Sequence, residues 1–183
     1  MDFLENNVRV AGFDPFNDRP SRTVRNTLAE MLRNCLGRHE VFPEDPADLL
    51  QDYPQPLYAD YIRDRVDRYR AATHEALSVS DSPVARAAIL WRHGLHFEAH
   101  EVLEPHWQAA SGEAREGLKG LVQAMGVYVL WEAGQDKAAV RLAGKAVARL
   151  RQFGDAIEEK QRMGVETLVT QLEHLIASSV DTR

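Results

Sequence analysis

The segment ILWRHGLHFEAH (Ile89–His100) occurs a second time, in related form, as VLWEAGQDKAAV (Val129–Val140), 40 residues further along the chain. Each copy contains a leucine–tryptophan pair, then a glycine, then an alanine: Leu90, Trp91, Gly94 and Ala99 in the first, and Leu130, Trp131, Gly134 and Ala139 in the second. This order predicts a helical hairpin, because the large residues fill a core, the glycine ends one helix and the alanine lets the next helix approach closely. We therefore predict an all-α fold.

The second copy continues as RLAGKAVARL (Arg141–Leu150) and resembles a tetratricopeptide hairpin. Only two copies are visible, which is fewer than a self-standing solenoid needs. We therefore predict a compact bundle of helical hairpins with tetratricopeptide-like repeat character, and not an open superhelix.

Helical periodicity dominates the C-terminal part of the chain, and strand signals are almost absent. Glycine, proline and capping residues divide it into helices expected at Pro83–His93, Leu95–Ala109, Glu113–Ala133, Asp136–Phe153 and Asp155 to about Ser178. The last helix would begin with a capping box formed by Asp155 and Glu158.

The N-terminal part contains two further predicted helices. One is capped by Ser21 and stops at Gly37, and the other spans Leu57–Leu77. Between them, His39–Pro56 contains four prolines and is expected to be an irregular linker.

The clearest boundary is SVSDSP (Ser78–Pro83), where Ser82 can cap a helix and Pro83 can occupy its first position. We therefore divide the chain into an N-terminal helical extension with a Pro-rich linker, residues 1–81, and a helical bundle domain, residues 82–183.

Composition argues against several classes of partner. A net charge of −6 gives no electrostatic footprint for nucleic acid. The most apolar run, Leu121–Trp131, is too short to span a bilayer, so no membrane partner is expected. The single cysteine, Cys35, favours a reducing compartment, and Met1–Val10 has no signal-peptide pattern. We expect a cytoplasmic protein.

The most polar segment of the bundle is LHFEAHEVLEPHW (Leu95–Trp107). At about 100° per residue, Glu104 lies near 40°, Trp107 near 340° and His96 near 320° from His100. These four residues share one narrow sector at the border of the apolar face, which makes them candidates for a site. Glu98 and Glu101 fall on the side away from that face and are expected to be solvated.

Two kinds of catalysis do not fit this segment. A zinc protease needs its general base directly after the first histidine of the pair, and Phe97 follows His96. Nucleophilic catalysis is not supported either, since Ser111 lies in a turn without an elbow motif and Cys35 lies in an apolar stripe.

Three interpretations of the sector remain open. His100 and Glu104 can form a structural pair at i, i+4 spacing. The sector can instead line a ligand-binding or catalytic pocket. It can also bind a metal ion through His96, His100 and Glu104, because imidazole and carboxylate groups suit zinc, iron or nickel.

The segment AHEVLEPHW (Ala99–Trp107) resembles the family called domain of unknown function 309, whose signature is His, three residues, Glu, two residues, Trp. His100, Glu104 and Trp107 match that signature, and the resemblance covers roughly residues 83–150. It implies a small all-α fold and no established activity. Many members place a histidine where this chain has Val129 and Leu130, and its absence here argues against a metal site completed by that residue.

The leading functional prediction is a small-molecule-binding pocket lined by His100, Glu104 and Trp107, with His96 and Gln123 beside them. The first alternative is a hydrolase or transferase in which Glu104 orients His100 as an acid–base group, with or without the help of a metal ion. The second alternative is a tetratricopeptide-like scaffold for protein interactions. The sequence identifies no cofactor, ligand or oligomeric state.

Overall fold

The computed structural model describes residues 12–78, 82–157 and 164–180. Within these ranges the chain forms eight α-helices and one 3₁₀ turn, and it contains no strand. The predicted all-α fold is therefore confirmed, whereas the tetratricopeptide-like character stays a prediction. No described helix has a stretch that is both apolar enough and long enough to cross a membrane.

The chain separates into two compact units. The first comprises Met1–Ser80 together with the short segment Arg92–Leu95, and the second comprises Asp81–Trp91 with His96–Arg183. Each unit is described by itself below.

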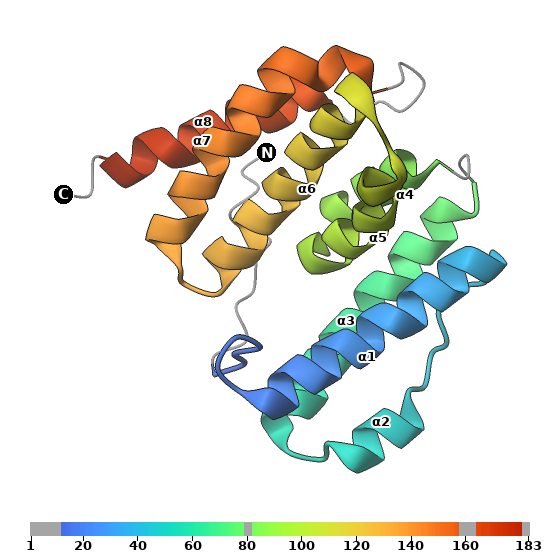
Figure 1. The fold of residues 1–183 in the computed structure, drawn as a ribbon. Coiled ribbons are helices and arrows are strands. Elements are labelled where there is room, and N and C mark those ends of the chain that lie inside the picture. The colour runs from blue at the N-terminus through green and yellow to red at the C-terminus, as the bar shows by residue number, and fades with distance from the viewer. Residues whose placement is uncertain (1–11, 79–81, 158–163, 181–183) are drawn as a thin grey trace. The chain divides into compact units, whose positions relative to one another are not determined.

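The first unit contains α1 (Arg19–Arg38), α2 (Ala47–Asp52) and α3 (Pro56–Ala76) (Figure 1). Helices α1 and α3 pack together. Their apolar positions recur every three or four residues, so each helix buries one face. The residues that fill this small core include Val24, Leu28, Leu32, Ile62, Val66 and Tyr69.

Three local predictions in this unit are wrong. Asp18, not Ser21, caps α1, since its carboxylate accepts the backbone N–H of Ser21 at 2.8 Å. The helix also runs through Gly37 and ends at Arg38, where His39 takes the left-handed conformation at φ 55°. The Pro-rich linker is not wholly irregular, because α2 forms inside it.

Helix α3 also binds the segment Arg92–Leu95. Arg65 donates to the carbonyl of Gly94 at 3.2 Å, and the Glu75 carboxylate lies 3.0 Å from Nε2 of His93. Burial raises the pKa of Glu75, but the hydrogen bond from His93 and the charge of Arg92 outweigh it and leave that pKa below its usual value. Gly94 has φ 68° and ends the helix before it, as the repeat predicted.

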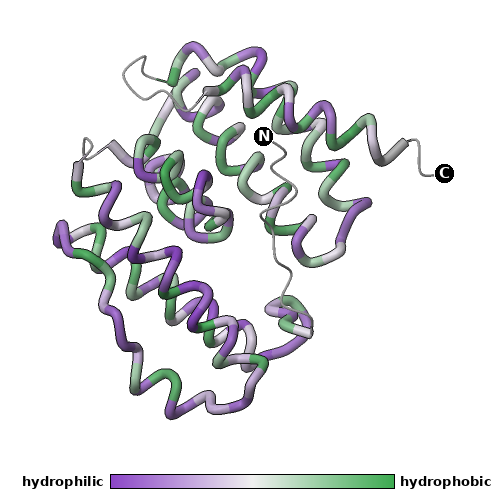
Figure 2. Tube along the Cα trace, turned by 180° about the vertical axis from the view of Figure 1, so that it is seen from behind, coloured by the Kyte–Doolittle hydropathy of each residue, from purple (hydrophilic) through white to green (hydrophobic). Residues whose placement is uncertain are grey.

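The second unit contains α4 (Pro83–Arg92), α5 (His96–Ala109), α6 (Gly112–Glu132), α7 (Asp136–Phe153), a 3₁₀ turn (Gly154–Ala156) and α8 (Val165–Val180). Helix α6 packs against both α5 and α7, and α7 packs against α8 (Figure 1). Along these helices hydrophobic positions alternate with hydrophilic ones, as the tube in Figure 2 shows. The core includes Leu95, Leu103, Leu121, Met125, Leu150, Leu168 and Leu172.

Glycines bring α6 close to the end of α7. A Cβ on Gly117 would lie 2.6 Å from the carbonyl oxygen of Phe153, and one on Gly120 would lie 2.9 Å from Leu150. Real Cβ atoms do not come that near, so the absence of a side chain lets the two backbones meet.

The helix boundaries follow the sequence signals at α4 and depart from them at α8. The hydroxyl of Ser82 accepts the N–H of Ala85 at 3.3 Å, which confirms the predicted cap. The last helix begins at Val165 and not at Asp155, since residues 154–156 form a 3₁₀ turn. Glu158, the second member of the predicted capping box, lies outside the described residues.

Candidate functional site

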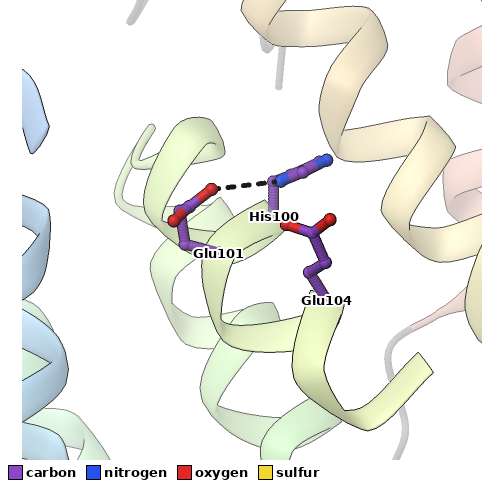
Figure 3. Close-up of side chains that lie close together, drawn as sticks. All are labelled: His100, Glu101 and Glu104. Atoms are coloured by element: carbon purple, nitrogen blue, oxygen red, sulfur yellow. Dashed lines mark ion pairs between the residues drawn. The ribbon is translucent and has the colours of Figure 1, made fainter. Parts of the chain in front are cut away.

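Three side chains of α5 gather at one place on the helix: His100, Glu101 and Glu104. Each offers one metal-ligating atom, and these atoms all lie within 4.8 Å of one another. Figure 3 shows the imidazole of His100 close to both carboxylates, with a dashed line to Glu101, and all three side chains are partly buried. We call this group the His100 cluster.

The partners within the cluster differ from the predicted pairing. Nδ1 of His100 lies 3.6 Å from Oε1 of Glu101, beyond hydrogen-bond distance, whereas Glu104 accepts from the amide of Gln108 at 3.3 Å. Nδ1 is shielded from solvent and has no hydrogen-bond partner among the described residues. The structural pair of His100 with Glu104 is therefore wrong, and Glu101 takes the neighbouring position.

Trp107 lies next to the cluster in the sequence of α5 and faces two cations of α6. The guanidinium carbon of Arg115 lies 5.6 Å from the centre of the indole ring, and the ammonium of Lys119 lies 5.8 Å from it. Both distances suit cation–π attraction. The indole Nε1 is buried without a hydrogen-bond partner in the described part of the chain. We call Trp107, Arg115 and Lys119 the Trp107 cradle.

His96 belongs to a separate cluster. Its side chain is only 5% exposed, its Nδ1 lies 2.5 Å from Oε1 of Glu132, and its ring stacks on that of Tyr128 at 4.7 Å. Burial raises the pKa of the Tyr128 hydroxyl well above its usual value. His96 thus joins α5 to the far end of α6 and does not enter the His100 cluster.

Gln123 contacts a different helix from the one expected. Its side-chain oxygen accepts from Arg149 of α7 at 3.2 Å, and the same guanidinium binds Glu116 at 2.8 Å. The hydrogen bonds from Arg149 lower the pKa of Glu116. Gln123 therefore takes part in a polar contact between α6 and α7.

Two glutamates of α5, Glu98 and Glu101, differ from their predicted solvation. Glu98 is 1% exposed, so its predicted solvation is wrong. Glu101 is partly buried beside His100. A signal for Glu101 was present, since His100, Glu101 and Glu104 put one imidazole and two carboxylates within five residues of a helix. Arg115 and Lys119 carried no comparable signal, because their place beside Trp107 depends on the register between α5 and α6.

Comparison with known families locates this site in a described domain. Residues 84–142 match the family described as Domain of unknown function (DUF309). This part of the chain is similar to that domain. The match confirms the resemblance noted in the sequence, and it includes α5, the His100 cluster and the Trp107 cradle. Comparisons with curated proteins and with solved structures give no match.

Proposed function

We propose that the DUF309-like domain binds a small ligand at the His100 cluster, and that this ligand is a divalent metal ion. The observation that carries the proposal is the approach of three donor atoms, from His100, Glu101 and Glu104, to within 4.8 Å of one another. Ligands bound at about 2.0–2.2 Å from an ion lie closer together than that, so small side-chain rotations complete the site.

The chemistry of the donors supports an ion of intermediate hardness. An imidazole suits zinc or iron, and carboxylates suit manganese or magnesium as well, so we choose Zn²⁺ as the probe. Two carboxylates held close together also repel each other, and a divalent ion removes that repulsion. The ion also stabilises His100, because the buried imidazole nitrogen Nδ1 has no hydrogen-bond partner among the described residues and would gain a polar one.

Two earlier alternatives receive less support. In the acid–base alternative Glu104 orients His100, but Glu104 accepts from Gln108 and it is Glu101 that lies beside Nδ1. The interaction-scaffold alternative draws on the sequence repeat alone. Binding, and not catalysis, is therefore the function proposed. We also propose a reducing, cytoplasmic setting without nucleic acid, supported by the single free thiol of Cys35 and the net charge of −6.

Calorimetric titration of the tag-free chain with Zn²⁺ tests the proposal. We expect one binding event, weakened at least about tenfold by His100→Ala or Glu104→Gln, since each change removes one of three protein ligands. Two changes at exposed positions, His106→Ala on α5 and Glu113→Gln on the neighbouring α6, serve as matched controls and should leave the affinity unchanged. Equal affinities in all variants would contradict the proposal.

A further inference from the structure

Beside the His100 cluster, the Trp107 cradle concentrates hydrogen-bond donors and positive charge. Arg115 and Lys119 of α6 lie over the indole ring of Trp107, and the indole N–H has no acceptor among the described residues. The nearby carboxylate of Glu116 is already bound by Arg149 of α7. Arg115 also donates to the backbone carbonyls of Gln108 and Ala110, and both cations interact electrostatically with Glu116. Within the described part of the chain, neither cation forms a direct ion pair with a carboxylate, so both keep charge that can face a bound anion.

The spacing along α5 places the cradle next to the ion site. Trp107 follows Glu104 by three residues and His100 by seven, so all three lie on one side of the helix. Helix α6 passes along this side, because Trp107 contacts Lys119 in the first half of α6 and His96 contacts Glu132 at its end. His100 and Glu104 lie between these two contacts.

The charges of the His100 cluster and the Trp107 cradle determine which ligand can bind between them. Without an ion, the charges of Glu101 and Glu104 balance those of Arg115 and Lys119. A divalent ion on the His100 cluster leaves a local surplus of about two positive charges. Three protein ligands also leave at least one coordination position of the ion for an outside group. An oxyanion satisfies both conditions, since its oxygens can bind a metal and accept from a guanidinium or ammonium group.

We propose that the ligand of this domain, beyond the metal itself, is a small oxyanion, a carboxylate or a phosphate group, bound between the ion on the His100 cluster and the Trp107 cradle. The inference rests on the proposed metal site. The cations hold the anion by charge-assisted hydrogen bonds, and the indole ring provides an apolar wall.

The test compares two probes on the full chain loaded with one equivalent of Zn²⁺, namely inorganic phosphate and acetate. We expect at least one of them to bind the loaded chain at least about tenfold more tightly than the metal-free chain, and native mass spectrometry should show that Zn²⁺ is retained. Preference for phosphate or for acetate identifies which kind of oxyanion the site takes. Binding should also change the tryptophan fluorescence, and Trp107→Phe should remove that change.

The variant Lys119→Gln separates this inference from the metal proposal. It should weaken binding of the preferred anion at least about fivefold and leave Zn²⁺ affinity within twofold, while Lys119→Arg restores anion binding. Lys145→Gln, at an exposed position of α7, is the matched control and should bind the anion as the parent chain does. Normal Zn²⁺ binding with no anion binding, or anion binding unaffected by Lys119→Gln, would overturn the inference alone. Failure of Zn²⁺ to bind would overturn both proposals.

Discussion

Nδ1 of His96 lies 2.5 Å from Oε1 of Glu132, so the first turn of α5 is tied to the last turn of α6. The imidazole also stacks on Tyr128, one turn earlier in α6. These two contacts and the contact of Trp107 with Lys119 fix the register of the two helices at both ends. The His100 cluster lies on the part of α5 between His96 and Trp107, so contacts with α6 hold the backbone on either side of the cluster.

Removing the carboxylate partner of His96 should destabilise the domain. In Glu132→Ala the buried imidazole loses its hydrogen bond, and we expect the free energy of unfolding to fall by about 1–2 kcal/mol. Urea denaturation measures this value. Glu30→Ala, at an exposed position of α1, is the control and should change it by less than about 0.5 kcal/mol. An equal effect of both changes would show that the His96–Glu132 contact contributes nothing.

Two glycine substitutions should have opposite signs. Gly117→Ala puts a Cβ 2.6 Å from the carbonyl of Phe153, which is backbone and cannot easily move, and should destabilise by about 1–3 kcal/mol. Gly144→Ala, in the middle of α7, meets nothing within 4 Å and should stabilise by about 0.5–1 kcal/mol. Chemical denaturation of both variants checks the signs, and a neutral Gly117→Ala would mean that α6 and α7 can separate at no cost.

Tyr128 should make the stability fall at alkaline pH. Burial raises the pKa of its hydroxyl in the folded chain above the unfolded value of about 10. The neutral hydroxyl therefore contributes stability that is fully present below about pH 10 and is lost as the pH rises further. Tyr128→Phe cannot ionise, so its free energy of unfolding should fall less steeply between about pH 9.5 and 11.

Urea denaturation at several pH values in that range measures the difference. Parallel slopes for the parent chain and Tyr128→Phe would show that the Tyr128 hydroxyl meets water freely in the folded state.

Local signals in the sequence were sufficient for most of the fold. The break at Gly94 and the cap at Ser82 depend on one or two residues, so they could be predicted without knowledge of packing. Glu98 could not be placed in this way. A helical wheel assumes one buried face, but Glu98 is covered on the side that the wheel assigns to solvent. Burial of that kind depends on which elements cover a helix, and no single segment encodes it.

The candidate site was also predicted only in part, because local spacing is readable from the sequence and the packing between helices is not. The positions of His100, Glu104 and Trp107 on one side of α5 follow from helical spacing alone. The partners of His96 and Gln123 follow instead from the registers of α5 with α6 and of α6 with α7. Helical spacing predicts a solvated Glu101, because its direction from the helix axis differs from that of His100. Its flexible side chain nevertheless reaches back to within 3.6 Å of the imidazole.

Native mass spectrometry of the tag-free full chain, incubated with Zn²⁺ and then freed of excess ion, tests the central claim most directly. The proposed site predicts one ion per chain, retained in His106→Ala and lost in both His100→Ala and Glu104→Gln. A chain that carries no ion, or one that keeps its ion in the His100 and Glu104 variants, would contradict the claim that the His100 cluster binds a metal.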